Sequence, residues 1–206
     1  WGYNPVTLMA PDPRLAPGGL ADLRLMASQL RLAGISVLLD LVFNHTGESD
    51  ILGPTLSFRG LDNRLYYRHM PDGRLVNDAG TGNVLATEHP QVTRLVVDAM
   101  RTYADATGID GFRLDLAVTI ARMPDGFSAT HPLLKAIADD PVLGRLTLIA
   151  EPWDVGPGGY QLGHFPAPWR EWNDRFRDDV RLFWRGGAGR AGRLATRIAG
   201  SSDFFG

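Results

Sequence analysis

The stretch Gly-Phe-Arg-Leu-Asp-Leu, at residues 111–116, places one acid at the end of a short apolar run. The stretch Ile-Ala-Glu-Pro-Trp-Asp, at residues 149–154, has the same design, with Glu151 as the acid. In barrels of parallel strands, catalytic groups collect at the carboxyl ends of the strands. An acid at each strand end therefore favours a (β/α)8 TIM barrel over an open sheet.

Helical and strand patterns alternate outward from these two stretches. Helical patterns with an apolar stripe cover residues 20–32, 89–107, 133–138, 169–184 and 190–199. Apolar runs of strand length cover residues 35–43, 109–116 and 146–150. The run at 35–43 is nearly continuous, which is typical of a strand buried on both faces. This order predicts parallel strands with right-handed crossovers, so the predicted fold class is α/β with a partial TIM barrel.

Residues 44–88 are rich in Gly, Asp, Asn and Pro and are too long for an ordinary connection between a strand and a helix. We expect this long strand-3 loop to contain little regular structure and to overhang the carboxyl end of the strands. A whole barrel needs about 250 residues. The 206 residues of this chain are therefore expected to be a fragment of one catalytic barrel domain, roughly strands 2 to 5 with their following helices.

Composition excludes several functional classes. The net charge of -2 and the pI of about 6.2 give no indication of nucleic acid or of an anionic membrane surface as partner. The chain has no cysteine, which rules out a disulfide framework and thiolate metal sites and fits a cytoplasmic protein. No apolar run approaches the roughly 20 residues that span a bilayer. The glycine-rich stretches lack a Walker lysine and a GxGxxG pattern, so phosphate binding is not expected.

Side chains alternate along a strand, so Arg113 and Asp115 are expected to point together into the mouth of the barrel. A neighbouring guanidinium favours the ionised form of a carboxylate, which suits a nucleophile. The alternative for this segment alone is a structural Arg-Asp pair.

Glu151 has apolar neighbours in the sequence, and loss of hydration favours the neutral form of a carboxyl group. A proton donor must hold its proton near neutral pH. For an isolated Glu-Pro pair, the alternative is a glutamate at a helix N-terminus. Together with Asp115 on the preceding strand, Glu151 completes the pair of carboxyl groups that cleaves a glycosidic bond.

Asp40, Asn44 and His45 follow the first strand without a cysteine or second histidine at metal-ligand spacing, so no metal site is expected. His45 comes directly after a buried strand, and we expect it to contact a ligand. Asp40 is either a further ligand contact or a buried hydrogen-bond anchor for the loops.

Aromatic side chains gather at two places and offer faces that stack on sugar rings. Trp1 and Tyr3 lie beside a turn at the start of the chain. After the third strand come Trp153, Tyr160, Trp169 and Trp172, of which about half are expected to be core residues.

Three segments resemble, in order, the first three signature regions of the α-amylase superfamily, glycoside hydrolase family 13. They are Asp40-Leu-Val-Phe-Asn-His45, Gly111-Phe-Arg-Leu-Asp115 and Glu151-Pro-Trp-Asp154. Finer features resemble bacterial glycogen debranching enzymes of the isoamylase type: Trp1-Gly-Tyr-Asn-Pro5, Gly60-Leu-Asp-Asn-Arg-Leu-Tyr-Tyr67, Thr81-Gly-Asn83 and Glu171-Trp-Asn-Asp174.

The resemblance implies a role for each matching residue. Asp115 would be the nucleophile, Glu151 the general acid and base, and Arg113 would orient Asp115. Tyr3 would stack under the sugar at the cleavage point and His45 would hydrogen-bond to it. Asp40 and Trp153 are expected among the substrate contacts as well. The implied reaction retains anomeric configuration and needs no cofactor. It cleaves α-1,6 branch linkages of glycogen or limit dextrins.

The resemblance also implies missing parts. The fourth signature region, whose Asp is a third catalytic carboxylate, is expected beyond Gly206. The first strand, an N-terminal accessory domain and the C-terminal part are expected outside this chain, so residues 1–206 alone are expected to be inactive. Alternatives within the family are an α-1,4-acting amylase or a trehalose-forming hydrolase. A non-catalytic relative is less favoured, because such proteins usually lack the nucleophile and acid.

Overall fold

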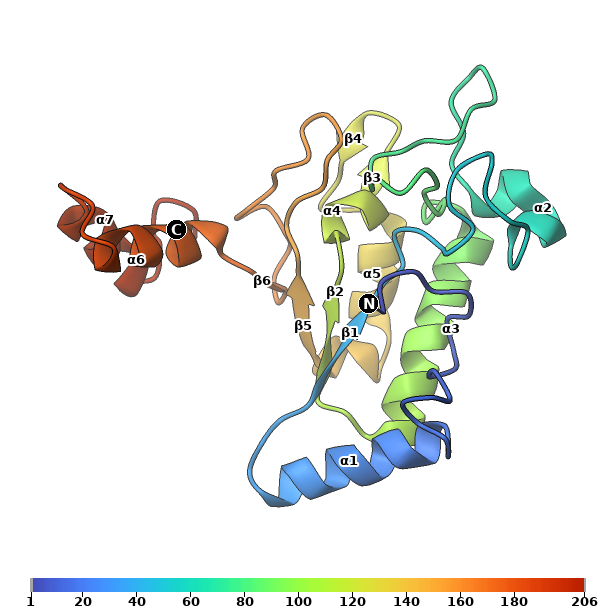
Figure 1. Ribbon diagram of the computed structural model, residues 1–206, viewed down its shortest axis with the longest axis horizontal. Coiled ribbons are helices and arrows are strands. Elements are labelled where there is room, and N and C mark those ends of the chain that lie inside the picture. Colours follow the sequence, from blue (N-terminus) through green and yellow to red (C-terminus); the bar gives the residue numbers. More distant parts are fainter. Residues whose placement is uncertain (1, 206) are drawn as a thin grey trace.

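The computed structural model describes residues 2–205, so Trp1, one of the expected sugar-stacking residues, lies outside the described residues. Its main sheet has four strands in the order in which they occur along the chain, and every neighbouring pair is parallel (Figure 1). The strands are β1 (Leu38–Leu41), β2 (Gly111–Leu114), β5 (Thr147–Ala150) and β6 (Arg170–Glu171). This sequential parallel order is the predicted α/β arrangement.

Helices that connect the strands cover one face of this sheet (Figure 1). The helix α3 (Pro90–Thr107) connects β1 to β2, and α5 (Pro132–Asp139) lies between β2 and β5 along the chain (Figure 1). The helix α1 (Leu20–Leu32) packs against α3. The smaller elements are α2 (Arg59–Tyr66), α4 (Ala117–Ile120), β3 (Arg122–Met123), β4 (Gly126–Phe127) and the 3-10 turn η1 (Leu143–Arg145).

The start and end of α3 follow directly from its sequence. Pro90 occupies the first turn, where its missing N–H costs nothing, and Gly108 ends the helix with a left-handed φ of 66°. Its apolar stripe, including Val96 and Ala99, is fully buried against the sheet. On the sheet side, the stripe meets Phe112 of β2 in one continuous core.

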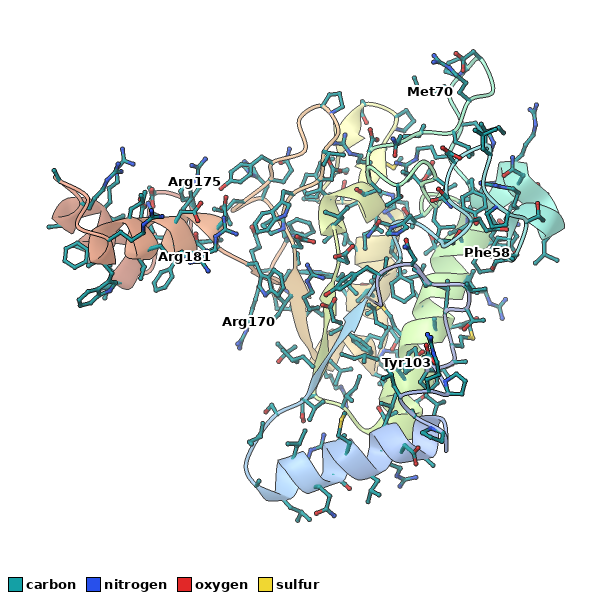
Figure 2. The ribbon with its side chains drawn as sticks, viewed as in Figure 1. Phe58, Met70, Tyr103, Arg170, Arg175 and Arg181 are labelled. Atoms are coloured by element: carbon teal, nitrogen blue, oxygen red, sulfur yellow. The ribbon has the colours of Figure 1, made fainter. Side chains whose placement is uncertain are left out.

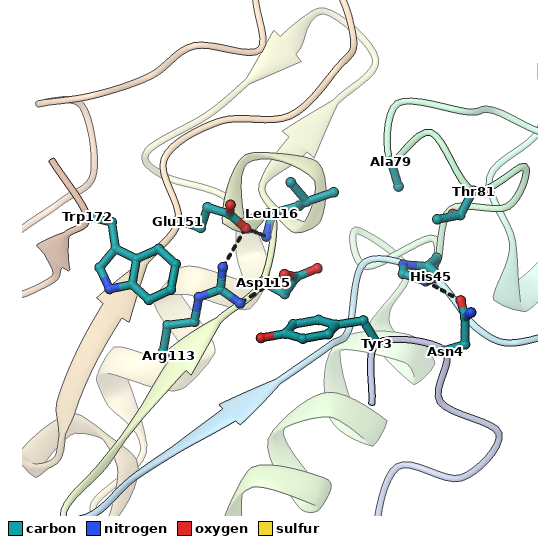
Figure 3. A pocket seen from close by; sticks show the side chains of 10 residues that line it. All are labelled: Tyr3, Asn4, His45, Ala79, Thr81, Arg113, Asp115, Leu116, Glu151 and Trp172. Carbon is teal, nitrogen blue, oxygen red and sulfur yellow. Dashed lines mark hydrogen bonds and ion pairs between the residues drawn. The ribbon is translucent and has the colours of Figure 1, made fainter. Parts of the chain in front are cut away.

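Alternation along β2 separates the core from the functional side of the sheet. Phe112 and Leu114 are fully buried in the core under α3 and α5. Arg113 and Asp115 point the other way, as predicted, and meet at the carboxyl end of the strand (Figure 3). The core thus fixes the strand, and the strand fixes the direction of the two polar side chains.

The prediction of a helix over 169–184 is wrong at its start. Residues Arg170–Glu171 form β6, which pairs with Ile149 and Ala150 of β5. The helix α6 begins only at Asp174, because the side chain of Asn173 accepts a hydrogen bond from the N–H of Phe176 and caps the first turn. A strand of two residues is too short to produce a recognisable hydrophobic period.

The expectation that the first strand is buried on both faces is also wrong. Leu38 is 38% exposed and Leu39 is only partly buried. Among residues 2–205, β1 pairs with β2 alone and forms an edge of the sheet. In α1 the helical period puts Leu23, Met26, Ala27 and Leu30 on one stripe, of which Ala27 is buried but Met26 is 44% exposed.

The segment 44–88 contains one short helix, α2, and isolated β-bridges. Its fold depends on the buried carboxylate of Glu48. That group accepts backbone N–H bonds from Leu56 and Ser57, both at 2.8 Å, and the hydroxyl bond of Tyr67. The segment lies above the carboxyl ends of the strands (Figure 1).

The last two helices, α6 (Asp174–Trp184) and α7 (Ala191–Ile198), pack on each other and extend away from the sheet beyond β6 (Figure 1). Arg175 and Arg181 lie on this arm (Figure 2). Within the described part of the chain, no helix has the length and apolar character needed to cross a membrane.

Candidate active site

A pocket of about 460 Å³ opens at the carboxyl ends of the strands (Figure 3). Its walls come from the first residues of the chain, the segment 44–88 and the ends of β2, β5 and β6. The polar and aromatic side chains that line it include Tyr3, His45, Arg113, Asp115, Glu151 and Trp172. Five of the residues that the sequence predicts for the site therefore lie around one cavity: Tyr3, His45, Arg113, Asp115 and Glu151.

The guanidinium of Arg113 is the centre of this pocket. Its Nη1 lies 2.8 Å from Asp40 Oδ1 and 2.9 Å from Asp115 Oδ1, and its Nη2 lies 2.7 Å from Glu151 Oε2. The strand register explains this meeting, because Arg113 pairs with Asp40 on one side and with Ile149, two residues before Glu151, on the other. One cation therefore holds acids from three neighbouring strands.

Asp115 is fixed through both of its carboxylate oxygens. Oδ1 contacts Arg113, and Oδ2 accepts a hydrogen bond of 2.9 Å from the side-chain amide of Asn44. The same amide also donates to the Asp115 carbonyl at 2.9 Å. The Asp115 side chain is 13% exposed and borders the pocket. A carboxylate with a donor on each oxygen is held in one orientation, which suits a nucleophile.

Glu151 is buried to about the same extent as Asp115. Its side chain is 12% exposed, and this burial raises the pKa of Glu151 above its ordinary value. The Leu116 N–H, which donates to Oε2 at 2.8 Å, and the charge of Arg113 lower that pKa without reversing the shift. The nearby charge of Asp115 raises it further. A carboxyl group that keeps its proton at higher pH is suited to proton donation.

Leu116 connects the two acids through an unusual backbone conformation. It is left-handed, with φ 41° and ψ 54°, which costs a leucine about 1–2 kcal/mol. In this conformation its N–H reaches Glu151 Oε2, while its side chain lines the pocket (Figure 3). The strained residue thus lies between Asp115 and Glu151, where backbone strain is often found at functional sites.

His45 is buried, and its ring borders the pocket. One ring nitrogen lies 2.5 Å from Asn44 Oδ1 and the other 3.2 Å from Asn4 Oδ1. Burial lowers the pKa of His45, which favours the neutral ring at neutral pH. A neutral ring in the pocket wall can donate or accept a hydrogen bond, which fits the expected contact between His45 and a ligand.

Tyr3 and Asp40 form a support for Arg113. The Tyr3 hydroxyl donates a hydrogen bond of 2.6 Å to Asp40 Oδ2, and the Tyr3 ring lies 6.0 Å from the guanidinium carbon. Tyr3 lines the pocket, whereas Asp40 does not. Asp40 has the contacts of the predicted hydrogen-bond anchor, but its side chain is 38% exposed rather than buried.

Trp153, an expected substrate contact, does not line the pocket. Its backbone forms a bridge with Tyr160, and its side chain donates a hydrogen bond that lowers the pKa of Glu151. Asp154 of the same motif is buried and is paired with Arg122 at 2.7 Å, so this acid anchors a loop. Two acids three residues apart therefore differ in role because only Glu151 faces the cavity.

Sequence reasoning missed several residues of the pocket. Asn4, Ala79, Thr81 and Leu116 line it, and Asn44 binds Asp115 from behind. Trp172 was expected only as one of four aromatic residues after the third strand, but its ring centroid lies 4.1 Å from the guanidinium carbon of Arg113. The wrong helix over 169–184 concealed this contact, because the strand at 170–171 brings Trp172 to the pocket edge. Within residues 2–205, no cluster of His, Cys, Asp and Glu side chains is arranged to hold a metal ion.

The chain is similar over its whole length to curated proteins of known name. It is 49% identical over 207 residues to "Glycogen debranching enzyme" of Pectobacterium carotovorum and 45% identical over 212 residues to "Glycogen operon protein GlgX homolog" of Mycobacterium tuberculosis. The chain is a homologue of bacterial glycogen debranching enzymes. It spans 31% and 29% of the lengths of those two relatives. No family model matches the chain.

Solved structures of pullulanases share its fold. The pullulanase of Anoxybacillus sp. LM18-11 complexed with maltotriose superposes with a TM-score of 0.70 at 25% identity, covering 90% of this chain and 27% of that one. Its complex with maltotetraose gives 0.71 at 26% identity. These similarities confirm the resemblance to glycogen debranching enzymes and the fold class of an α/β partial barrel.

Proposed function

We propose that the protein is a glycoside hydrolase that cleaves α-1,6-glucosidic branch linkages of glycogen or limit dextrins. The observation that carries the proposal is the placement of Asp115 and Glu151. They follow neighbouring parallel strands, line one pocket and contact the two terminal nitrogens of Arg113. A pair of carboxyl groups in different environments is what a retaining glycosidase requires.

In the first step, Asp115 attacks the anomeric carbon of the sugar at the branch point. The bond between that carbon and the glycosidic oxygen breaks, and Glu151 gives its proton to the departing oxygen. A covalent glycosyl ester on Asp115 results. Arg113 and Asn44 hold the attacking carboxylate in position, since both of its oxygens accept a hydrogen bond.

In the second step, Glu151 acts as a base. It takes a proton from water, whose oxygen attacks the anomeric carbon and displaces Asp115. Two inversions restore the original anomeric configuration. The raised pKa of Glu151 supports this double role, because the same group must give a proton and then accept one.

Three further side chains are proposed to hold the sugar. The ring of Tyr3 would form an apolar face under it, and neutral His45 would hydrogen-bond to its hydroxyl groups. Trp153 does not line the pocket. We propose that it instead adjusts the pKa of Glu151 through the hydrogen bond of its side chain. No cofactor enters the proposed reaction.

The proposed linkage and substrate rest on the relatives. Proteins 49% and 45% identical to this chain are named for glycogen debranching or for the glycogen operon, and the similar solved structures are pullulanases bound to maltotriose or maltotetraose. The alternative is cleavage or rearrangement of an α-1,4 linkage, with the same two acids. The pocket residues are compatible with either linkage, so the assay must compare substrates.

The chain accounts for about a third of its curated relatives. We therefore propose that residues 1–206 are part of a larger catalytic domain. Further residues of that domain would complete the barrel and supply a third carboxylate. A branched α-glucan is the proposed partner, and a cytoplasmic location stays a prediction from the absence of cysteine.

The test is made with the complete protein. Reducing ends released from glycogen limit dextrin, pullulan and linear amylose are compared for the wild type, Asp115→Asn and Asp139→Asn. We expect release from the branched substrates, loss of at least a thousandfold in D115N, and wild-type rates in D139N, whose exposed carboxylate pairs with Lys135. Preferential cleavage of amylose would reject the debranching activity, and an active D115N would reject the proposed nucleophile.

A further inference from the structure

The guanidinium of Arg113 has few means of staying in place apart from the acids that it binds. Its side chain is 8% exposed and its Nε is buried without a hydrogen-bond partner among residues 2–205. Its orientation therefore depends on the two terminal nitrogens and on whatever covers its faces. A guanidinium held only at Nη1 and Nη2 can turn about the line between these two atoms unless a group packs on its face. Such a rotation would lengthen its contacts with Asp115 or Glu151.

One face of this guanidinium is covered by Trp172. The centroid of the Trp172 ring lies 4.1 Å from the guanidinium carbon, close enough for a strong cation–π contact (Figure 3). The Tyr3 ring lies at 6.0 Å, a weaker contact. The ring of Trp172 also lines the pocket, so it stands between part of the guanidinium and water.

The backbone on both sides of Trp172 is anchored, which fixes the point from which its ring extends over Arg113, although the residue is 45% exposed. The Trp172 N–H donates to the carbonyl of Ala150, the residue before Glu151, at 3.0 Å. The carboxylate of Glu171 accepts the backbone N–H groups of Gly163 and Phe165, at 2.6 and 3.1 Å. The side-chain amide of Asn173 donates to Ser201 at 2.9 Å.

We infer that Trp172 is a positioning residue, which holds the Arg113 guanidinium against Asp115 and Glu151 by stacking on its face. This inference rests on the proposed function for its kinetic consequence. Trp172 acts through Arg113 and has no direct part in the bonds that form and break. Its aromatic face is the property that matters, since an apolar side chain of similar bulk lacks the attraction for a cation.

The test separates the aromatic face from bulk. In the complete protein, Trp172→Phe keeps a ring and Trp172→Leu keeps only apolar volume. We expect kcat to fall less than threefold in W172F and about tenfold or more in W172L, with little change in KM. Trp169→Phe is the matched control, because Trp169 is a buried core residue beside Phe165 and should lower thermal stability without that kinetic pattern. Equal losses of kcat in W172F and W172L would overturn the inference.

A double-mutant cycle with Arg113→Met, which removes the cation, tests whether the effect passes through the guanidinium. If it does, W172L costs about tenfold with Arg113 and less than twofold with R113M. A rise in KM of the same size in both backgrounds would instead identify Trp172 as a sugar-stacking surface and overturn the positioning role.

A crystal structure of W172L in the complete protein gives a readout that does not depend on activity. We expect Arg113 Nη2 to move beyond ion-pair distance from Glu151 Oε2. An unchanged contact would overturn the inference even if the protein proved inactive on every glucan. Inactivity of the wild type on all three glucans would reject the proposed function and leave this structural test in force.

Discussion

Glu151 differs from Asp115 mainly in what surrounds its carboxyl group. Asp115 accepts donors on both oxygens, from Arg113 and Asn44. Glu151 accepts the Leu116 N–H and the Arg113 contact on the same oxygen, Oε2. These contacts and the Trp153 hydrogen bond favour the ionised form of Glu151, so its raised pKa comes from burial and from the nearby charge of Asp115.

This environment predicts a pH dependence for the complete protein. Burial raises the pKa of Glu151, so the proton donor is present below that raised pKa and is lost as pH increases through it. We expect the activity to fall on the alkaline side for this reason. Glu151→Gln cannot lose a proton, so it should abolish the alkaline limb and reduce kcat by about 10²- to 10⁴-fold.

The measurement is a profile of kcat/KM against pH for the wild type and E151Q. An alkaline limb that persists unchanged in E151Q would show that another group carries it. Activity equal to the wild type would remove Glu151 from the mechanism.

At the scale of elements, the segment 44–88 depends on one buried acid. Burial by itself raises the pKa of Glu48, but the Tyr67 hydroxyl and the N–H groups of Ser57, Arg59 and Leu56 outweigh it and leave that pKa lowered. The ionised carboxylate collects donors from three backbone positions and one side chain. It therefore replaces the strand or helix pairing that this segment mostly lacks.

We predict that Glu48→Gln destabilises the protein by on the order of 1–3 kcal/mol at neutral pH, because the amide nitrogen of Gln cannot accept the backbone N–H groups. Since the folded-state pKa of Glu48 is lowered, the stabilisation is full above the unfolded-state pKa and is lost as pH falls through the folded-state value. The difference in thermal midpoint between wild type and E48Q should therefore shrink in acid. Asp72→Asn, which changes an exposed acid in the same segment, is the control. A constant difference at all pH values would contradict the role of the ionised form.

The sequence was sufficient for the elements with a clear period. The helix α3 and the strands β2 and β5 occur where alternation and the helical stripe indicate them, and the strand-end rule places Asp115 and Glu151 at the same edge. The contact between Arg113 and Glu151 could not be predicted, because it depends on the register between two strands far apart in the chain. The stacking of Trp172 on Arg113 could not be predicted for a related reason, since β6 is too short to show any period.

At the scale of the whole molecule, residues 1–206 leave much apolar surface uncovered. Leu15, Leu32, Leu52 and Trp184 are large apolar residues that are mostly exposed. Within residues 2–205, β1 has a neighbouring strand on one side only. Exposed apolar side chains and unpaired strand edges both promote association.

We predict that residues 1–206 expressed alone associate in solution and release no more than about one hundredth of the reducing ends that the complete protein releases from limit dextrin. The chain accounts for about a third of its relatives. The third carboxylate that we propose to lie outside it would be worth roughly 10²- to 10³-fold in rate. Size-exclusion chromatography and the reducing-end assay check the two parts. A monomer with the turnover of the complete protein would refute the prediction.

The meeting of three carboxyl groups on Arg113 has a consequence for the kinds of sugar that the pocket admits. Arg113 balances one acid, so Asp40 behind the pocket and Asp115 on its wall leave a formal excess of one negative charge even with Glu151 protonated. Its local potential repels sugars that carry phosphate, sulfate or uronate groups, and attracts amino sugars in their ammonium form. The charge around Arg113 therefore favours a neutral sugar chain over one that carries anionic groups.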